Sequence, residues 1–167
     1  MISRICSFLN VMLVALLLVS CQTTPKTDLE KIEALKKQLQ ADSKTLEQIK
    51  SNEFASLEHD FIICDSLLQY MHPEAIDEAF QDLQLTKAYL EQFKTTQPSI
   101  KTDIDSTLYR LECLSNDISS HYLSDSLAAV YLDDETQHAE LLNNQVNYFK
   151  DRFDACQNEL NTLKGRK

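Results

Sequence analysis

The near absence of glycine constrains this chain more than any other feature. Its 167 residues include one glycine, Gly165, where an average usage of about 7% would give roughly a dozen. Glycine provides the backbone for tight hairpin turns and for loops that cradle phosphate groups, so both are disfavoured here. After residue 20, valine occurs only at Val130 and Val146, whereas Leu, Lys, Glu and Gln are abundant. The composition therefore predicts an all-α fold.

Apolar residues recur every three or four positions along four segments, which we expect to be helices at about 28–71, 73–94, 99–119 and 124–163. Pro73 and Pro98 stand at the start of the second and third segments, where a helix tolerates proline. The expected turns are 95–98 and 119–124, with 133–134 as the alternative to the latter. The apolar stripe of the first segment slips in phase near Glu53 and Phe54.

These lengths predict an elongated up-down bundle of four helices in one domain, residues 28–165. Residues 25–49 and 149–163 of the long first and last helices would form a two-helix, coiled-coil-like stalk. The two shorter helices would pack only against the far halves of the long ones, which makes a four-helix head. The chain would then enter and leave the bundle at the same end. Self-association of the long first helix as a parallel coiled coil is an alternative.

Charge is unevenly distributed along the chain, whose formal net charge is −10. Residues 26–50 hold six basic and five acidic residues, residues 51–149 four and eighteen, and residues 150–167 five and three. This predicts a slightly basic stalk and an acidic distal head. The head is a solvated surface in the simplest interpretation, and a docking surface for a basic partner or a small cationic ligand in the alternative. Its negative charge disfavours nucleic acid.

The first twenty residues are typical of a signal peptide. A single charge, Arg4, precedes an apolar run from Val11 to Val19 and a small residue, Ser20. The run is shorter than the roughly 20 residues that a membrane-spanning helix needs. The four residues Leu18-Val19-Ser20-Cys21 resemble the lipobox of bacterial lipoproteins at every position. The resemblance implies cleavage before Cys21, lipidation of that cysteine with acyl chains such as palmitate, and a lipidated linker over 21–27.

The residues after the cysteine refine the expected location, again by resemblance. Lipoproteins kept in the inner membrane tend to carry Asp directly after the lipidated cysteine, where this chain has Gln22. Residues 22–26 also contain no acidic run of the kind that some surface-exposed lipoproteins carry. The resemblance therefore implies an outer-membrane protein that faces the periplasm.

Three cysteines lie beyond the lipobox: Cys64, Cys113 and Cys156. Cys64 and Cys156 fall on apolar stripes and are expected to be buried as small apolar side chains. Cys64 and Cys113 would lie at a similar level, but on diagonal helices, beyond the Cα separation of about 7 Å that a disulfide allows. Whether any bridge forms is left open.

Four histidines are weak candidates for zinc ligands, in two pairs. His72 and His121 should meet at the distal tip, and His59 and His138 should lie at similar heights on antiparallel helices. Neither pair has the spacing of a metal-binding motif. No carboxylates are spaced so as to single out an acid and a base. We therefore expect a non-enzymatic, cofactor-free structural or protein-binding module, with binding of a metal or small cationic ligand as the alternative.

Overall fold

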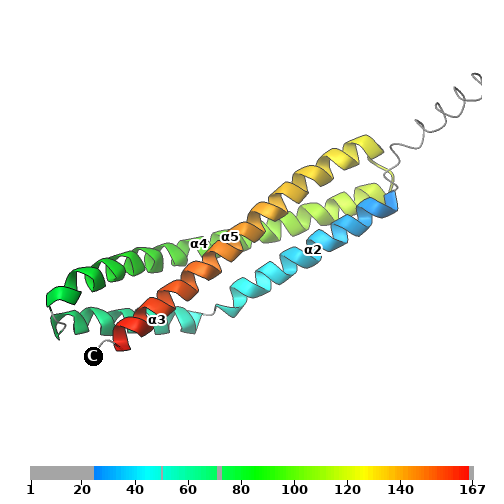
Figure 1. The fold of residues 1–167 in the computed structure, drawn as a ribbon. Helices are drawn as coiled ribbons and strands as arrows, with labels where there is room; N and C mark the ends of the chain where they lie inside the picture. Colours follow the sequence, from blue (N-terminus) through cyan, green and yellow to red (C-terminus); the bar gives the residue numbers. More distant parts are fainter. Residues whose placement is uncertain (1–24, 50, 71–72, 166–167) are drawn as a thin grey trace, which may run out of the picture.

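The computed structural model describes residues 25–49, 51–70 and 73–165, and its regular structure in these ranges is entirely helical (Figure 1). Four α-helices follow one another along the chain, with a short 3-10 helix, η1, after the second. Their bounds are α2 Pro25–Gln48, α3 Ser51–Leu67, η1 Leu68–Tyr70, α4 Pro73–Ser119 and α5 Asp125–Gly165. The all-α prediction is confirmed.

Two predicted helix boundaries are wrong. The expected helix 28–71 is divided into α2 and α3, which meet near residue 50. Conversely, the expected helices 73–94 and 99–119 are one helix, because α4 continues through Pro98 where a turn was predicted. The turn expected at 119–124 is confirmed, and its alternative, 133–134, lies inside α5.

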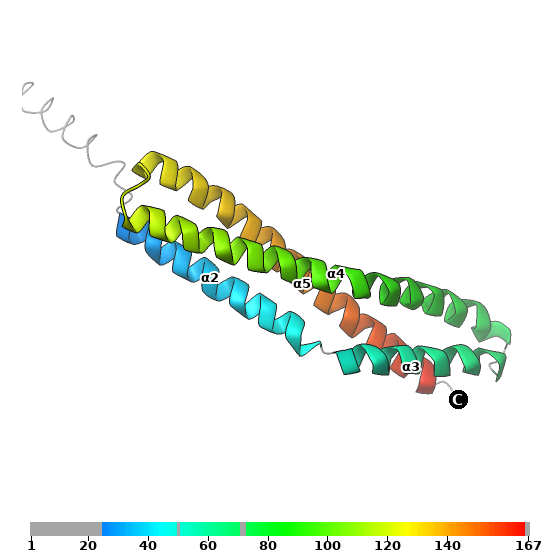
Figure 2. The same cartoon turned by 180° about the vertical axis from the view of Figure 1, so that it is seen from behind.

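The helices form a long bundle, called the rod below, in which α2 and α3 lie end to end as one arm against α4 and α5 (Figures 1 and 2). Both α2 and α3 contact α4 and α5. Each level of the rod is therefore three helices thick. The predicted four-helix head on a two-helix stalk is wrong, because the uninterrupted α4 spans the whole rod.

The direction of each helix follows from the cross-helix contacts. Lys36 pairs with Glu112 at 2.6 Å and Glu47 with Lys101 at 2.6 Å, so α2 and α4 are antiparallel. Asn143 of α5 donates a hydrogen bond of 2.9 Å to the Asp42 carboxylate of α2. Further along both the arm and α5, the Cys64 thiol contacts the Leu160 carbonyl oxygen at 3.4 Å. The α2–α3 arm therefore runs parallel to α5.

The two ends of the described chain lie at opposite ends of the rod. α2 begins beside the turn that joins α4 to α5, whereas α5 ends near α3 and η1 (Figures 1 and 2). Three passes along the rod necessarily separate the first residue from the last. The expectation that the chain enters and leaves at one end is therefore wrong.

The core is a continuous apolar seam along the rod. The stripe predicted on the last helix is buried over its whole length: Leu142, Val146, Phe149, Phe153, Cys156, Leu160 and Leu163. At mid-length the seam becomes aromatic, with ring centroids 5.0–6.4 Å apart among Phe54, Phe93, Phe149 and Phe153. This aromatic cluster joins α3, α4 and α5 just beyond the break in the first arm.

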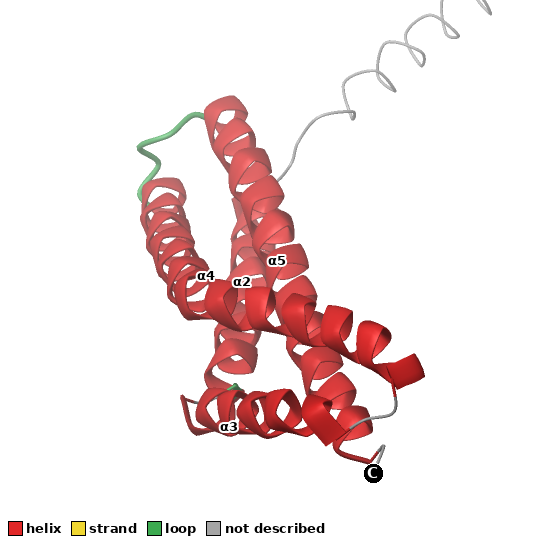
Figure 3. Cartoon of the chain, turned by 90° about the vertical axis from the view of Figure 1, so that its left-hand side faces the viewer, coloured by secondary structure: helices red, strands yellow, loops and turns green. Residues whose placement is uncertain are grey.

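The end of α2 is held by a side chain of α4. The Gln97 amide nitrogen donates hydrogen bonds to the carbonyl oxygens of Leu46, at 2.6 Å, and Ile49, at 3.0 Å. The last carbonyl groups of a helix have no hydrogen-bond donor within that helix. The Gln97 amide supplies the donor that the next turn would supply if α2 continued. The neighbouring Pro98 lacks an N–H group, and α4 changes direction near its middle (Figure 3).

Within the ranges given above, no helix has the length and apolar character needed to cross a membrane.

Candidate functional site

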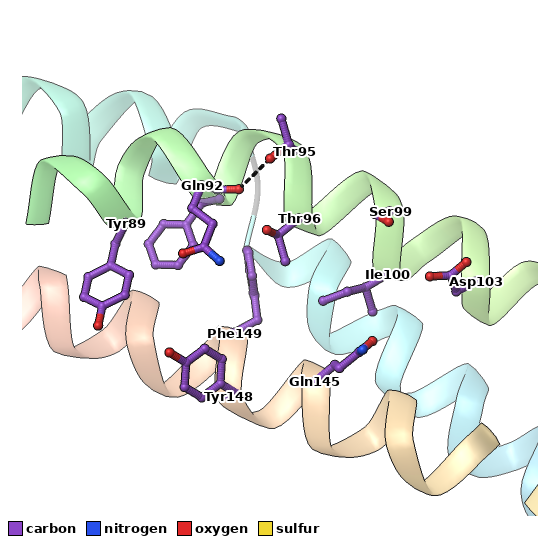
Figure 4. A pocket seen from close by; sticks show the side chains of 11 residues that line it. Tyr89, Gln92, Thr95, Thr96, Ser99, Ile100, Asp103, Gln145, Tyr148 and Phe149 are labelled. Atoms are coloured by element: carbon purple, nitrogen blue, oxygen red, sulfur yellow. Dashed lines mark hydrogen bonds between the residues drawn. The ribbon is translucent and has the colours of Figure 1, made fainter. Parts of the chain in front are cut away.

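A groove of about 420 Å³ lies between α4 and α5 at mid-length of the rod (Figure 4). Its volume is within the range of about 300–1,000 Å³ that is usual for ligand sites. The lining residues come from both helices: Tyr89, Gln92, Phe93, Thr95, Thr96, Ser99, Ile100, Asp103, Gln145, Tyr148 and Phe149.

Helical spacing explains how these side chains come together. On α4, the polar lining residues Gln92, Thr96, Ser99 and Asp103 follow one another at intervals of three and four, so they share one face of the helix, and Thr95 borders that face. On α5, Gln145 and Tyr148 each directly precede a residue of the buried stripe, Val146 and Phe149. The lining therefore runs beside the core seam, on the side of α4 and α5 away from the α2–α3 arm. A fourth helix would cover this face in a four-helix bundle.

Arg152 borders the groove and is stacked against two tyrosines. Its guanidinium carbon lies 5.4 Å from the ring centroid of Tyr89 and 5.2 Å from that of Tyr148. These distances are typical of cation–π contacts. None of the ion pairs between described residues includes Arg152. The groove therefore presents a fixed, permanently charged guanidinium that is free to pair with an acidic group of a ligand.

Charged and polar groups also cross the helix interfaces. Arg110 pairs with the buried Glu135 at 2.6 Å and donates a second hydrogen bond of 3.0 Å to Thr107. The buried Thr86 donates to Glu159 at 3.0 Å. Such partners inside a helical bundle fix its register, so we assign them a structural role.

Asp42, which interrupts the apolar stripe of the first arm, is buried against α5. One of its carboxylate oxygens accepts the hydrogen bond from Asn143, and the other has no partner among the described residues. Burial raises the pKa of Asp42, and the Asn143 hydrogen bond opposes that effect.

A smaller hollow of about 220 Å³ lies beside the break between α2 and α3. It is bordered by the ends of α2 and α3 and by α5, where Lys150 and Asp154 form an ion pair. Glu53 is the third charged residue of its lining, and the hollow has about half the volume of the groove.

The first predicted histidine pair lies only partly within the described residues. His72 lies outside the described residues, and Pro73, the residue after it, begins α4 at one end of the rod. His121 lies in the turn at the other end (Figure 1). The predicted shared location at one tip is wrong, because α4 is a single helix that runs the whole length of the rod between Pro73 and the turn that contains His121.

The second histidine pair is separated, because the helices that carry it are parallel rather than antiparallel. The contacts of Cys64 with Leu160 and of Asp60 with Lys164 place His59 near the level of residues 155–164 of α5. His138 lies about 20 residues earlier on that helix, or roughly 30 Å away at 1.5 Å per residue. Across the described ranges, no group of three or more His, Cys, Asp or Glu side chains could hold a metal ion.

The three cysteines are free thiols; Cys64 and Cys156 are buried as expected, and Cys113 is exposed. Burial raises the pKa of both buried thiols, that of Cys156 to about 11. The expectation that Cys113 lies level with Cys64 was wrong, because the neighbouring Glu112 pairs with Lys36 in the other half of the rod. Cys21 lies outside the described residues, and its lipidation stays a prediction.

The charge pattern does not separate into an acidic head and a basic stalk. The acidic segment 51–149 covers α3, all of α4 and more than half of α5, so it reaches both ends of the rod. Opposite charges also pair across the α2–α4 interface in both senses, Lys36 of α2 with Glu112 of α4 and Glu47 of α2 with Lys101 of α4.

Sequence reasoning did not single out Tyr89, Tyr148 or Arg152. The available signal was the polar and aromatic stripe directly before the buried one on the last helix. The four-helix expectation concealed it, because a further helix was expected to pack there. The chain matched no protein-family model, no curated protein and no solved structure.

Proposed function

We propose that this chain is a lipid-anchored envelope protein without enzymatic activity, whose rod binds a protein partner in the α4–α5 groove. The observation that carries the proposal is Arg152 stacked between Tyr89 and Tyr148 at the groove. Tyrosine and arginine are among the residues that contribute most to protein interfaces. Holding the guanidinium in place before binding also reduces the entropy that binding removes.

The anchor rests on the lipobox resemblance, and with it the proposed location on the periplasmic face of the outer membrane. Acyl chains on Cys21 would hold the protein stably, since each buried methylene contributes about 0.8 kcal/mol. The groove would then stand away from the membrane. Tyr148 lies 23 residues into α5 from Asp125, or roughly 35 Å along the rod. A partner projecting from the membrane or the cell wall fits that reach.

The anchor is tested by Cys21→Ala in the full-length chain. We expect the variant to leave the membrane fraction, because no acyl chain can be attached, and the unsubstituted protein to stay there. Immunoblots of separated membrane and soluble fractions measure this. Retention of the variant in the membrane would refute a lipid anchor at this cysteine.

The groove is tested by a photo-crosslinking amino acid at Gln145, which lines it, in full-length protein in intact envelopes. The matched control is the same group at Gln40, an exposed residue of α2 that does not line the groove. We expect an adduct with a second protein from position 145 and none from position 40.

Arg152→Ala and Tyr148→Ala should each lower the yield of that adduct by about thirtyfold or more, the effect of losing an interface residue worth at least about 2 kcal/mol. Equal adducts from positions 145 and 40, or an adduct insensitive to both alanine variants, would contradict the groove as the binding site. An adduct with a second copy of this chain would instead identify self-association, the alternative that the sequence also allows.

A further inference from the structure

Apolar and aromatic side chains are exposed at the end of the rod where α4 turns into α5. Tyr122 in the turn is 83% exposed, and three residues in the first two turns of α5 are also exposed: Leu127, Val130 and Tyr131. The last three are spaced at i, i+3 and i+4, so they share one side of the helix. We call these four residues the tip.

The turn fixes Tyr122 in its exposed position. His121 has a left-handed backbone, with φ of 56°. Its N–H donates to the carbonyl of Ile118 at 3.1 Å, and the N–H of Tyr122 donates to that of Asp117 at 2.9 Å. These two bonds and the left-handed residue form a Schellman cap, which closes the end of α4. Tyr122 therefore projects from a fixed turn.

The tip lies at the end of the rod where the described chain begins (Figures 1 and 2). Pro25, the first residue of α2, is four residues from Cys21. An extended chain spans at most about 3.6 Å per residue, so the lipidated cysteine would lie within about 15 Å of Pro25. A membrane that holds Cys21 is then near this end of the rod.

The chemistry of the tip suits the boundary between water and lipid. Tyrosine is enriched at both interfaces of membranes, because its ring is apolar and its hydroxyl is polar. Exposed carboxylates also lie on α5, at Asp125 between Tyr122 and Leu127 and at Asp133 and Asp134 directly beyond the tip, and these charges belong in water. The change from apolar to acidic side chains therefore sets a shallow depth of insertion.

We propose that the tip inserts into the interfacial layer of the membrane in which Cys21 is anchored, so that the rod meets the bilayer at two points. The inference rests on the proposed lipid anchor. It assigns Tyr122 and the first two turns of α5 to lipid contact, and leaves the groove at mid-length clear of the membrane.

The test uses the absence of tryptophan from the chain. A single tryptophan is introduced into full-length lipidated protein by Tyr122→Trp or, as the matched control, by Tyr70→Trp. Tyr70 is 79% exposed and lies at the other end of the rod. Both proteins are reconstituted in vesicles of phosphatidylethanolamine and phosphatidylglycerol that contain lipids brominated near the headgroup. Tryptophan fluorescence and flotation of the vesicles are measured on the same samples.

We expect the brominated lipids to quench the fluorescence of Tyr122→Trp at least twofold and to leave that of Tyr70→Trp unchanged. Flotation without quenching of Tyr122→Trp would overturn the inference and leave the anchor intact. Stronger quenching of Tyr70→Trp would reverse the orientation and also overturn it. Failure of both variants to float with the vesicles would refute the anchor, and the inference with it.

Discussion

The first arm of the rod and α4 run side by side and are interrupted in opposite ways. The arm breaks between α2 and α3 although neither proline nor glycine occurs at the junction. α4 is 47 residues long, contains Pro98 at the same level and continues through it. Intrinsic propensity would place the interruption in α4. Contacts between the helices therefore decide where these helices end.

Two contacts account for the difference. Gln97 satisfies the final carbonyls of α2, which lets that helix stop inside the rod without leaving buried acceptors unpaired. Across Pro98, the buried side chains of Phe93 and Ile100 hold both halves of α4 in the core. The ring of Pro98 itself is exposed and displaces nothing in the seam. α4 thus tolerates its proline by bending, whereas the arm ends at a cap.

The largest effect is expected from Phe149→Ala, which removes one ring of the aromatic cluster beside the break. Phe149 is 2% exposed and its ring lies 5.0 Å from that of Phe93. We expect the free energy of unfolding to fall by about 3–5 kcal/mol, the usual effect of deleting a buried aromatic side chain. Urea denaturation followed by circular dichroism measures it.

The control for Phe149→Ala is Tyr148→Ala at the neighbouring, exposed position, which should lower stability by less than about 1 kcal/mol. Similar losses for the two variants would mean that the aromatic cluster is not what joins α3 to α4 and α5.

A smaller effect is expected from Gln97→Ala, which removes the cap of α2. Loss of hydrogen bonds to the Leu46 and Ile49 carbonyls should lower the free energy of unfolding by about 1 kcal/mol. The loss should be local, so hydrogen exchange of the amides at the end of α2 should accelerate more than exchange in α5. Uniform acceleration along the rod would contradict a capping role.

The matched variant for Gln97→Ala is Pro98→Ala, one residue further along α4. Alanine restores an N–H donor and removes the ring, so stability should rise, by up to about 3 kcal/mol. The exchange of α2 amides should not change, because the cap stays in place. Fusion of α2 and α3 into one protected helix in this variant would show that Pro98, not Gln97, causes the break.

How much of this could be predicted differs from residue to residue. The prediction of the stripe from Leu142 to Leu163 is confirmed, because its spacing is regular over about six turns of one helix. The phase slip near Glu53 and Phe54 did mark the break, but it was read as a defect within one helix. Its cap, Gln97, lies about 50 residues away in sequence, so no local pattern identifies it.

The proline misled the prediction in the other direction. Pro98 follows a threonine-rich stretch that resembles a turn, and only the burial of Phe93 and Ile100 on either side shows that the helix continues. Because a turn was predicted at Pro98, the expected architecture placed the chain ends and the histidines wrongly and covered the face that carries the groove. The groove residues Tyr89, Tyr148 and Arg152 belong to a face that is exposed because each level of the rod is three helices thick instead of four.

The smallest effect is expected from Asp42→Asn, at the buried carboxylate of the α2 half. Burial raises the pKa of Asp42 above its ordinary value of 3.8, so the folded protein binds that proton more tightly than the unfolded chain. Ionisation then lowers stability as pH rises from about 3.8 through the raised pKa, and the loss is complete at neutral pH. An amide keeps the acceptor for Asn143 and carries no charge.

We therefore expect Asp42→Asn to raise the melting temperature at pH 7, by the equivalent of about 1 kcal/mol or less, and to match the unsubstituted protein at pH 3. Thermal unfolding at the two pH values measures this, with Glu140→Gln as a control at an exposed carboxylate of α5. A lower melting temperature for Asp42→Asn at pH 7 would mean that the charged hydrogen bond with Asn143 outweighs burial. Asp42 would then join Gln97 as a polar residue that stabilises the first arm, rather than one tolerated within it.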